Sequence, residues 1–208
     1  MEQVLSVYAR ERDAKRPLVC VDEFSKQLLG QVSDPIPMKP GQPEREDHEY
    51  IREGTLSAFM IASPLEGTRE VFVAPDRRRT ALDYALAMEH LAANIYPDAE
   101  KIVVVQDNLN THKIDSFYKA FPAHKARALV ERFEFHYTPK HGSWLNIAEI
   151  EISALTRTCL RRRISSDGDF ITETEAYTAK KNLSPKPVNW QFTCEDARTK
   201  LRNLYPEC

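Results

Sequence analysis

Three acidic residues, far apart in the chain, occur in contexts where their carboxylates could share a divalent cation. Asp22 ends one apolar run, Asp107 follows another, and Glu149 lies in a segment with helical spacing. Both apolar runs are rich in β-branched residues, which is typical of strands buried on both faces. Open α/β sheets place their chemistry at the carboxyl ends of such strands. A plain turn is the competing interpretation of Asp107 and Asn108, because these residue types favour turns.

Three clustered carboxylates would require a positive partner. They repel one another, and without a cation at least one would take up a proton. Two Mg²⁺ ions about 3.5–4 Å apart remove this penalty and clamp the attacking and leaving oxygens of a phosphodiester displacement. Oxygen ligands favour Mg²⁺ or Mn²⁺ over zinc. The acids therefore predict a site for two Mg²⁺ ions, with Mn²⁺ as a substitute. The chain has 31 acidic residues, so the alternative is that three of them occur in such contexts by chance and have only structural roles.

The segment that carries Glu149 predicts a helix over residues 143–160, capped by Ser143. Its apolar residues recur at helical spacing and form a stripe that faces the core. At about 100° per residue, Glu149 lies roughly 80° from the centre of that stripe. Glu151 lies at the opposite edge of the same stripe. Helical geometry alone therefore does not choose between the two glutamates.

The elements that must position these acids predict an α/β fold. Strands are expected over residues 18–24, 55–61, 69–73, 102–105 and 133–137, and helices over 80–96, 113–121, 125–132, 143–160 and 193–204. Residues 30–54 predict an extended insertion or loose hairpin, and residues 161–191 form a charged, proline-containing stretch. This order predicts a ribonuclease H-like mixed five-stranded sheet, with three antiparallel strands followed by two parallel ones and helices on both faces.

Composition limits the possible classes of protein. With 208 residues, 42% hydrophobic and 29% charged, the chain predicts one domain over residues 17–208, preceded by a linker or helix over 1–16. A net charge of −2 means that any DNA contact must come from local basic patches. Four scattered cysteines without a C-x-x-C pair fit a reducing cytosol, and no membrane span is expected. None of the six glycines forms a phosphate-binding loop, so no nucleotide cofactor is expected.

Three ordered motifs resemble those of the DDE transposases of bacterial insertion sequences in the mariner superfamily. The motifs are Val21-Asp22-Glu23, then Asp107-Asn108-Leu109-Asn110-Thr111-His112, then Tyr137-Thr138-Pro139-Lys140-His141-Gly142-Ser143-Trp144-Leu145-Asn146-Ile147-Ala148-Glu149. Weaker similarity continues from Asp169 and at Trp190-Gln191-Phe192-Thr193, so the resemblance covers almost the whole chain.

This resemblance implies a ribonuclease H-like catalytic domain that cleaves DNA with Mg²⁺ at element ends and joins 3′-hydroxyl ends to target DNA. It assigns the catalytic and metal-binding acids to Asp22, Asp107 and Glu149, and its L-N-x-x-E pattern favours Glu149 over Glu151. It further implies a homodimer in the active complex and a bacterial cytoplasmic protein, associated with the nucleoid when it acts. The family's N-terminal helix-turn-helix region has no counterpart in this sequence, which suggests an excised domain or a truncated product.

Further residues have both a functional and a structural interpretation. Asn108, His112 and Asn146 could support the acids, or could be turn, packing and helix-cap residues. Candidate DNA contacts, each with a solvent-exposed or core alternative, are Lys140, His141, Trp144, Arg77, Arg78, Arg79, Arg161, Arg162 and Arg163. For Trp144 a core position is the more frequent outcome.

Two other functions remain open from the sequence. A different ribonuclease H-like nuclease, such as a junction resolvase, would cleave branched DNA without strand transfer. A non-catalytic DNA-binding remnant would bind neither Mg²⁺ nor Mn²⁺ at the three acids, although the presence of all three acids counts against it.

Overall fold

A five-stranded mixed sheet forms the centre of the computed structural model, which describes residues 1–43, 45, 47–140 and 142–205. The strands are β1 (Leu18–Gln31), β2 (Tyr50–Ser63), β3 (Thr68–Val73), β4 (Ile102–Gln106) and β5 (Phe133–Tyr137). Their order across the sheet is β3-β2-β1-β4-β5. β1, β2 and β3 pair antiparallel, whereas β4 pairs parallel with β1 and with β5. The predicted ribonuclease H-like arrangement is confirmed.

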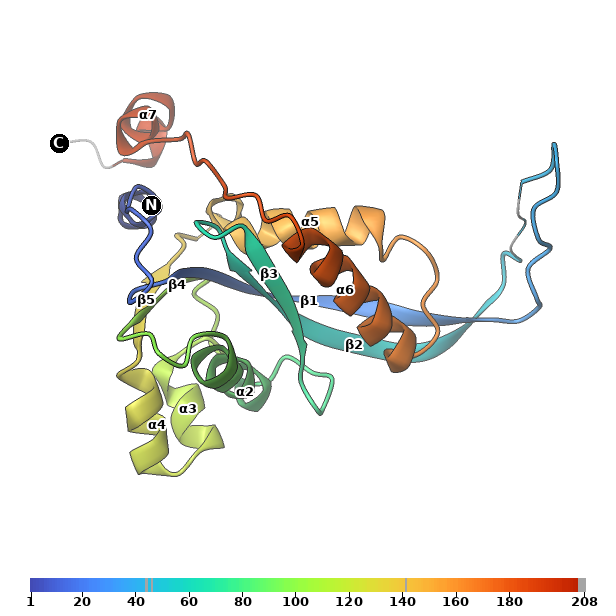
Figure 1. Ribbon diagram of the computed structural model, residues 1–208, viewed down its shortest axis with the longest axis horizontal. Coiled ribbons are helices and arrows are strands. Elements are labelled where there is room, and N and C mark those ends of the chain that lie inside the picture. Colours follow the sequence, from blue (N-terminus) through green and yellow to red (C-terminus); the bar gives the residue numbers. More distant parts are fainter. Residues whose placement is uncertain (44, 46, 141, 206–208) are drawn as a thin grey trace.

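Helices cover both faces of this sheet, as predicted (Figure 1). The α-helices are α1 (Glu2–Tyr8), α2 (Ala81–His90), α3 (Ile114–Ala120), α4 (Ala123–Val130), α5 (Ile147–Thr158), α6 (Asp167–Asn182) and α7 (Cys194–Lys200). Short turns of other helix types follow α2 as η1 (Leu91–Ile95), precede α5 as η2 (Ser143–Leu145) and follow α7 as η3 (Arg202–Leu204). α1, α5, α6 and α7 pack on one face, and α2, α3 and α4 pack on the other. No helix among the described residues is long and apolar enough to cross a membrane.

β1 and β2 are much longer than the apolar pattern predicts, with 14 residues each. Their outer halves form a hairpin arm that projects from the rest of the molecule (Figure 1). The segment that connects the two strands at the tip of the arm is largely exposed and includes the apolar residues Val32, Ile36 and Met38. The strands continue here because backbone groups pair with each other whether or not their side chains are buried. Apolar periodicity reports burial, so it detects only the inner half of each strand.

Two helices differ from the prediction. α5 begins after Asn146 rather than at Ser143, because the Asn146 side chain accepts a hydrogen bond from the amide of Ala148, while Ser143 starts the short η2 turn. α6 was not predicted at all. Its buried positions are Phe170, Thr174 and Thr178, which recur every four residues but are mostly polar. A search for apolar spacing therefore misses this helix.

The first helix belongs to the main core. Val4, Leu5, Val7 and Tyr8 of α1 are buried in the same cluster as the sheet and α5. The Tyr8 hydroxyl donates a hydrogen bond of 2.6 Å to the carbonyl of Leu145, directly before α5. The domain boundary at residue 17 stays a prediction, but α1 helps to fix the loop that leads into α5.

A buried ion pair connects α5 to the edge strand β3. The Arg69 guanidinium contacts both carboxylate oxygens of Glu151, at 2.9 and 3.2 Å, and the two side chains are only 7% and 15% exposed. Breaking such a pair leaves one charge buried without compensation, which costs about 3–5 kcal/mol.

We expect Glu151→Gln to lower the free energy of unfolding by about 3 kcal/mol, measured by urea denaturation. Glu195→Gln removes an exposed acid in the first turn of α7 and serves as the control, with an expected change below about 0.5 kcal/mol. Equal stability of the two variants would contradict a structural role for Glu151.

Candidate metal and nucleic-acid site

Parallel pairing of β1 with β4 brings two of the three predicted acids to the same place. The register aligns Cys20 with Val105, so that its continuation by two residues sets Asp22 opposite Asp107. Cys20 and Val105 both point into the core that α5 covers. Because side chains alternate along β1, Asp22 also lies on the α5 side of the sheet. It lies within β1 rather than at its end, which corrects the prediction, since the strand continues to Gln31. Asp107 follows the last residue of β4, and its carboxylate contacts His112.

α5 contributes Glu149 to this group. The carboxylates of Glu149 and Asp107 both lie near enough to Asp22 to raise its pKa. Glu151 instead points toward β3, where it pairs with Arg69. These surroundings favour Glu149 as the third acid of the predicted site, because Glu151 is already paired with a cation.

The surroundings of Asp22 disfavour its ionised form. Burial, together with the nearby carboxylates of Glu149, Asp107 and Glu23, raises the pKa of Asp22 to about 7. The Asp22 side chain is only 6% exposed. A buried carboxylate among other acids is a group that a divalent cation would stabilise.

Asn146 holds Asp22 in place. Its side-chain amide is fully buried and donates hydrogen bonds of 3.0 Å to the Asp22 carboxylate and to the carbonyl of Val21. The side-chain oxygen of Asn146 caps α5. Asn146 thus caps the helix that carries Glu149 and also orients Asp22. The sequence left open whether Asn146 is a helix cap or a residue that supports the acids, and it is both.

His112 connects Asp107 to a fourth acid. Its Nδ1 lies 2.5 Å from the Asp107 carboxylate and its Nε2 lies 2.9 Å from that of Glu23. Burial alone would lower the pKa of His112, but hydrogen bonds to Asp107 and Glu23 outweigh it and raise the pKa to about 9. His112 is therefore a buried imidazolium that neutralises part of the acidic charge.

Glu23, Asp107 and His112 also offer one atom each within 4.8 Å of one another, close enough to hold a metal ion. Both ring nitrogens of His112 already contact a carboxylate. In the metal-free protein the imidazolium acts as a counter-charge to these two acids, and it would have to lose a proton to bind a metal ion.

Two residues that the sequence did not predict, Tyr84 and Gln106, support His112. The ring of Tyr84 on α2 stacks on His112 with 4.7 Å between centroids, and its hydroxyl donates to Gln106. The Gln106 amide in turn donates to the carbonyl of His112, at 3.0 Å. The signal in the sequence was a polar glutamine directly after the apolar run 102–105, and in the structure this side chain is fully buried. Glu23 belonged to a recognised motif but was not singled out.

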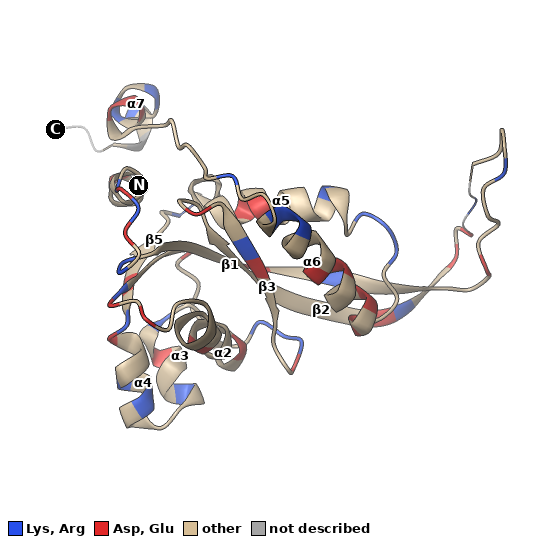
Figure 2. Cartoon of the chain, in the orientation of Figure 1, with Lys and Arg blue, Asp and Glu red and all other residues tan. Residues whose placement is uncertain are grey.

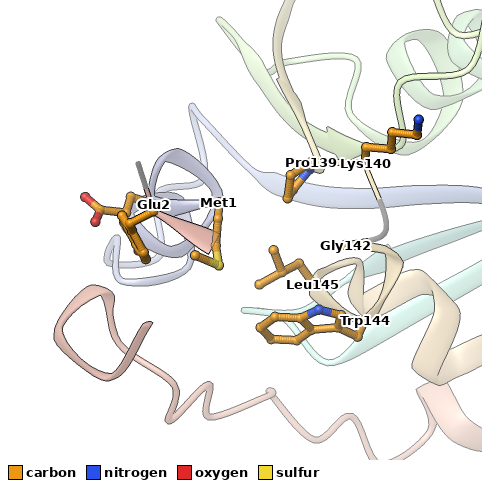
Figure 3. A pocket seen from close by; sticks show the side chains of 8 residues that line it. Met1, Glu2, Pro139, Lys140, Gly142, Trp144 and Leu145 are labelled. Atoms are coloured by element: carbon orange, nitrogen blue, oxygen red, sulfur yellow. The ribbon is translucent and has the colours of Figure 1, made fainter. Parts of the chain in front are cut away.

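The loop before α5 carries the predicted DNA-contact residues. Lys140 lines a cavity of about 400 Å³ together with Asp107 and Asn108, and also lines a neighbouring cavity of about 410 Å³ together with Trp144. Figure 3 shows the second cavity, with Met1 and Glu2 on the opposite side from Trp144. The core position expected for Trp144 is wrong, because 46% of its surface is exposed. His141 lies outside the described residues.

Most of the predicted arginine patches are engaged within the protein. Arg162 pairs with Glu173, Arg77 pairs with Asp167, and Arg163 donates to the carbonyls of Asp47 and Glu49. Arg79 lies 3.8 Å from Glu23. These contacts give several of the arginines an intramolecular role, whereas no described partner is recorded for Arg78 or Arg161, which are both exposed.

Comparisons with known proteins identify the family. The family model described as DDE superfamily endonuclease matches residues 17–171, which include all three acids. The chain belongs to this family of endonucleases. No curated protein matches the sequence.

Solved structures of one transposase share the fold. The Mos1 transposase paired-end complex with the left transposon end aligns with a TM-score of 0.55 and 18% identity. The Mos1 mariner paired-end complex with Mn aligns with a TM-score of 0.54 and 18% identity, and the Mos1 strand transfer complex with 0.55 and 15%. The alignments cover 86% of this chain, which spans about half the length of those structures. At this level of identity the likeness establishes the fold.

The raised pKa of Asp22 predicts how the stability of the metal-free protein depends on pH. The folded protein holds this proton more tightly than the unfolded chain, so that stability falls as pH rises from about 4 to about 7. Between pH 5 and pH 8 the loss from this group is about 2–3 kcal/mol. Asp22→Asn should remove that loss, as measured by urea unfolding in EDTA.

Metal binding provides the complementary measurement. We expect Mg²⁺ or Mn²⁺ to raise the melting temperature of the wild-type protein more at pH 8 than at pH 5.5, because protons compete for Asp22 at the lower pH. The metal should leave the melting temperature of Asp22→Asn nearly unchanged. Equal metal effects in the two proteins would mean that the cation binds elsewhere.

Proposed function

We propose that this chain is the catalytic domain of a transposase, which uses Mg²⁺ to cleave DNA phosphodiester bonds at element ends and joins the freed 3′-hydroxyl ends to target DNA. The observation that supports the proposal is that Asp107, directly after β4, and Glu149, in the first turn of α5, both lie close enough to Asp22 in β1 to raise its pKa, in a member of the DDE endonuclease family.

The donor set fits two divalent cations. Asp22, Asp107 and Glu149 supply carboxylate oxygens, the ligands preferred by Mg²⁺ and Mn²⁺. The burial and mutual repulsion that raise the pKa of Asp22 are the conditions that bound cations would relieve. When bound, two such ions activate a water or hydroxyl nucleophile and stabilise the charge that develops on the leaving oxygen.

The remaining residues orient this centre. Asn146 and the amide of Glu23 each donate to one carboxylate oxygen of Asp22, and His112 contacts one oxygen of Asp107. These contacts orient both carboxylates, whose remaining lone pairs can bind cations. Lys140 lies between the Asp107 cavity and the Trp144 cavity, where its ammonium can hold a backbone phosphate. The exposed indole of Trp144 can stack on a base beside the scissile bond.

DNA and a second copy of the chain are the proposed partners. The Mos1 structures are described as paired-end, transposon-end and strand transfer complexes, which supports the same class of substrate for this chain. The paired-end description supports two catalytic subunits in the active complex, and we propose a homodimer for this protein on that basis. Its expected place of action is bacterial DNA in the cytoplasm.

Removal of a single proposed ligand should abolish cleavage without unfolding the protein. We expect Asp107→Asn and Glu149→Gln to reduce Mg²⁺-dependent nicking of supercoiled plasmid by at least about 10³-fold, because each variant removes a charge that positions the cations. Glu195→Gln should nick at the wild-type rate. Wild-type nicking by Asp107→Asn would exclude its assigned role.

A pre-cut substrate separates the transposase from the two alternatives. A transposase should join a labelled duplex with a free 3′-hydroxyl to plasmid DNA in Mg²⁺. A junction resolvase would cut four-way junctions and form no joined product, whereas a DNA-binding remnant would bind the duplex with no reaction and show no calorimetric signal for Mn²⁺. Joined product from wild-type protein, absent in Glu149→Gln, is the expected result.

A further inference from the structure

A second concave surface lies on the other side of α5, at the edge of the sheet. The cavity has a volume of about 700 Å³ and is lined by Arg69, Glu151, Thr158, Tyr177, Lys180, Lys181, Ser184 and Lys186. Four of these eight side chains are basic and one is acidic. In Figure 2 the Lys and Arg positions gather near the end of α6 and the adjacent β3, although the whole chain carries a net charge of −2. We call this surface the lysine groove.

The floor of the lysine groove is preorganised. Arg69 and Glu151 form the buried ion pair that connects β3 with α5. The side-chain amide of Asn182, at the end of α6, accepts a hydrogen bond from the Arg69 amide and donates one to the Arg69 carbonyl, as a neighbouring strand would. The groove is therefore built on the sheet edge and not on a loose surface loop.

The segment after α6 is held equally closely. The amide of Val188 donates to the carbonyl of Pro64 in the turn between β2 and β3. Gly67 in that turn has a φ of 72°, and a Cβ atom there would lie 2.3 Å from the backbone of Lys186. Only glycine permits this approach, which fixes the position of Lys186 opposite Lys180 and Lys181.

The lysines of the groove are available for a ligand. Lys180, Lys181 and Lys186 are exposed, and none of them makes an ion pair with a residue in the described part of the chain. The Lys181 ammonium lies 5.7 Å from the centre of the Tyr177 ring, a cation–π contact that leaves its N–H donors directed to solvent. Three exposed ammonium groups on one concave surface fit the oxygens of phosphate groups.

The lysine groove is separate from the acid cluster. It adjoins β3, whereas Asp22 lies on β1, two strand spacings or about 10 Å across the sheet. Each strand of a DNA duplex carries one phosphate per about 3.4 Å of helix axis, so a duplex that crosses the sheet would rise by about three base pairs over this separation. A ligand in the groove therefore does not occupy the position of the scissile phosphate.

We propose that the lysine groove binds backbone phosphates of DNA several nucleotides from the bond that is cleaved, without reading the base sequence. The inference rests on the proposed action on DNA, but it concerns binding alone. A chain with a net charge of −2 needs a local basic patch to bind DNA. The arginine runs were the predicted patch, and Lys180, Lys181 and Lys186 are now proposed for this role.

Binding of a fluorescent 30-base-pair duplex of arbitrary sequence, measured by anisotropy in EDTA, tests the proposal without catalysis. The variant Lys180→Gln/Lys181→Gln/Lys186→Gln should bind about 10-fold or more weakly at moderate salt. Its slope of log K against log salt should be smaller by about 2–3, since each lost phosphate contact contributes about 0.9. Changing the duplex sequence should leave both effects unaltered.

A matched control separates the groove from net charge. Lys15→Gln/Lys39→Gln/Lys119→Gln removes the same charge from three exposed lysines on other parts of the chain and should keep the wild-type slope. Arginine at all three groove positions should restore binding, and equal melting temperatures should show that each variant folds. Equal loss in the control and groove variants would overturn the proposal.

Two further outcomes are informative. Displacement of the duplex by millimolar inorganic phosphate, at constant ionic strength, would identify a site for free phosphate and overturn the assignment to DNA. Nicking at saturating plasmid should persist in the groove variant, because the acids are unchanged. Absence of nicking in the wild-type protein would contradict the proposed cleavage while leaving the binding result intact.

Discussion

A buried carboxylate with other acids around it is the constraint on which the rest of this structure depends. Asp22 is buried, Asp107 is half-buried and Glu149 is exposed. Burial first, and then the charges of the other acids, raise the pKa of Asp22 to about 7, so that ionising this group costs free energy. The fold tolerates this cost because the pairing of β1 with β4 and the packing of α5 are fixed by the apolar core. Asn146 and His112 then supply donors that hold two of the acids in defined orientations.

α5 illustrates how one short helix serves two purposes. At about 100° per residue, Glu149 and Glu151 lie roughly 200° apart around its axis. One lies near Asp22 in β1, and the other contacts Arg69 on β3. The same residue type is therefore destabilising on one side of the helix and stabilising on the other. A residue that destabilises the fold is a candidate for function, whereas one in a satisfied buried pair is explained by structure.

The basic residues also divide into two groups, those paired within the protein and those without an ion pair among the described residues. Arg77 and Arg162 are paired with acids, and Arg163 bonds to backbone carbonyls of the arm. The lysines at the end of α6 make no such pairs within the described residues. Arginine's planar fork suits fixed contacts inside the protein, and lysine's flexible ammonium suits a mobile polyanion. Counting charges along the sequence could not make this distinction, because pairing depends on which elements are neighbours.

The sequence by itself determined the sheet arrangement and the family, and it predicted the three acids, because buried strands and clustered motifs leave local patterns. Apolar runs located β4 and the inner halves of β1 and β2. Only the tertiary structure decided what depends on neighbours: the length of the hairpin arm, the polar helix α6, the start of α5 at Asn146 and the partners of His112. It also exposed Trp144 and separated Glu149 from Glu151, since burial and charge pairing are properties of the folded surroundings rather than of any single segment.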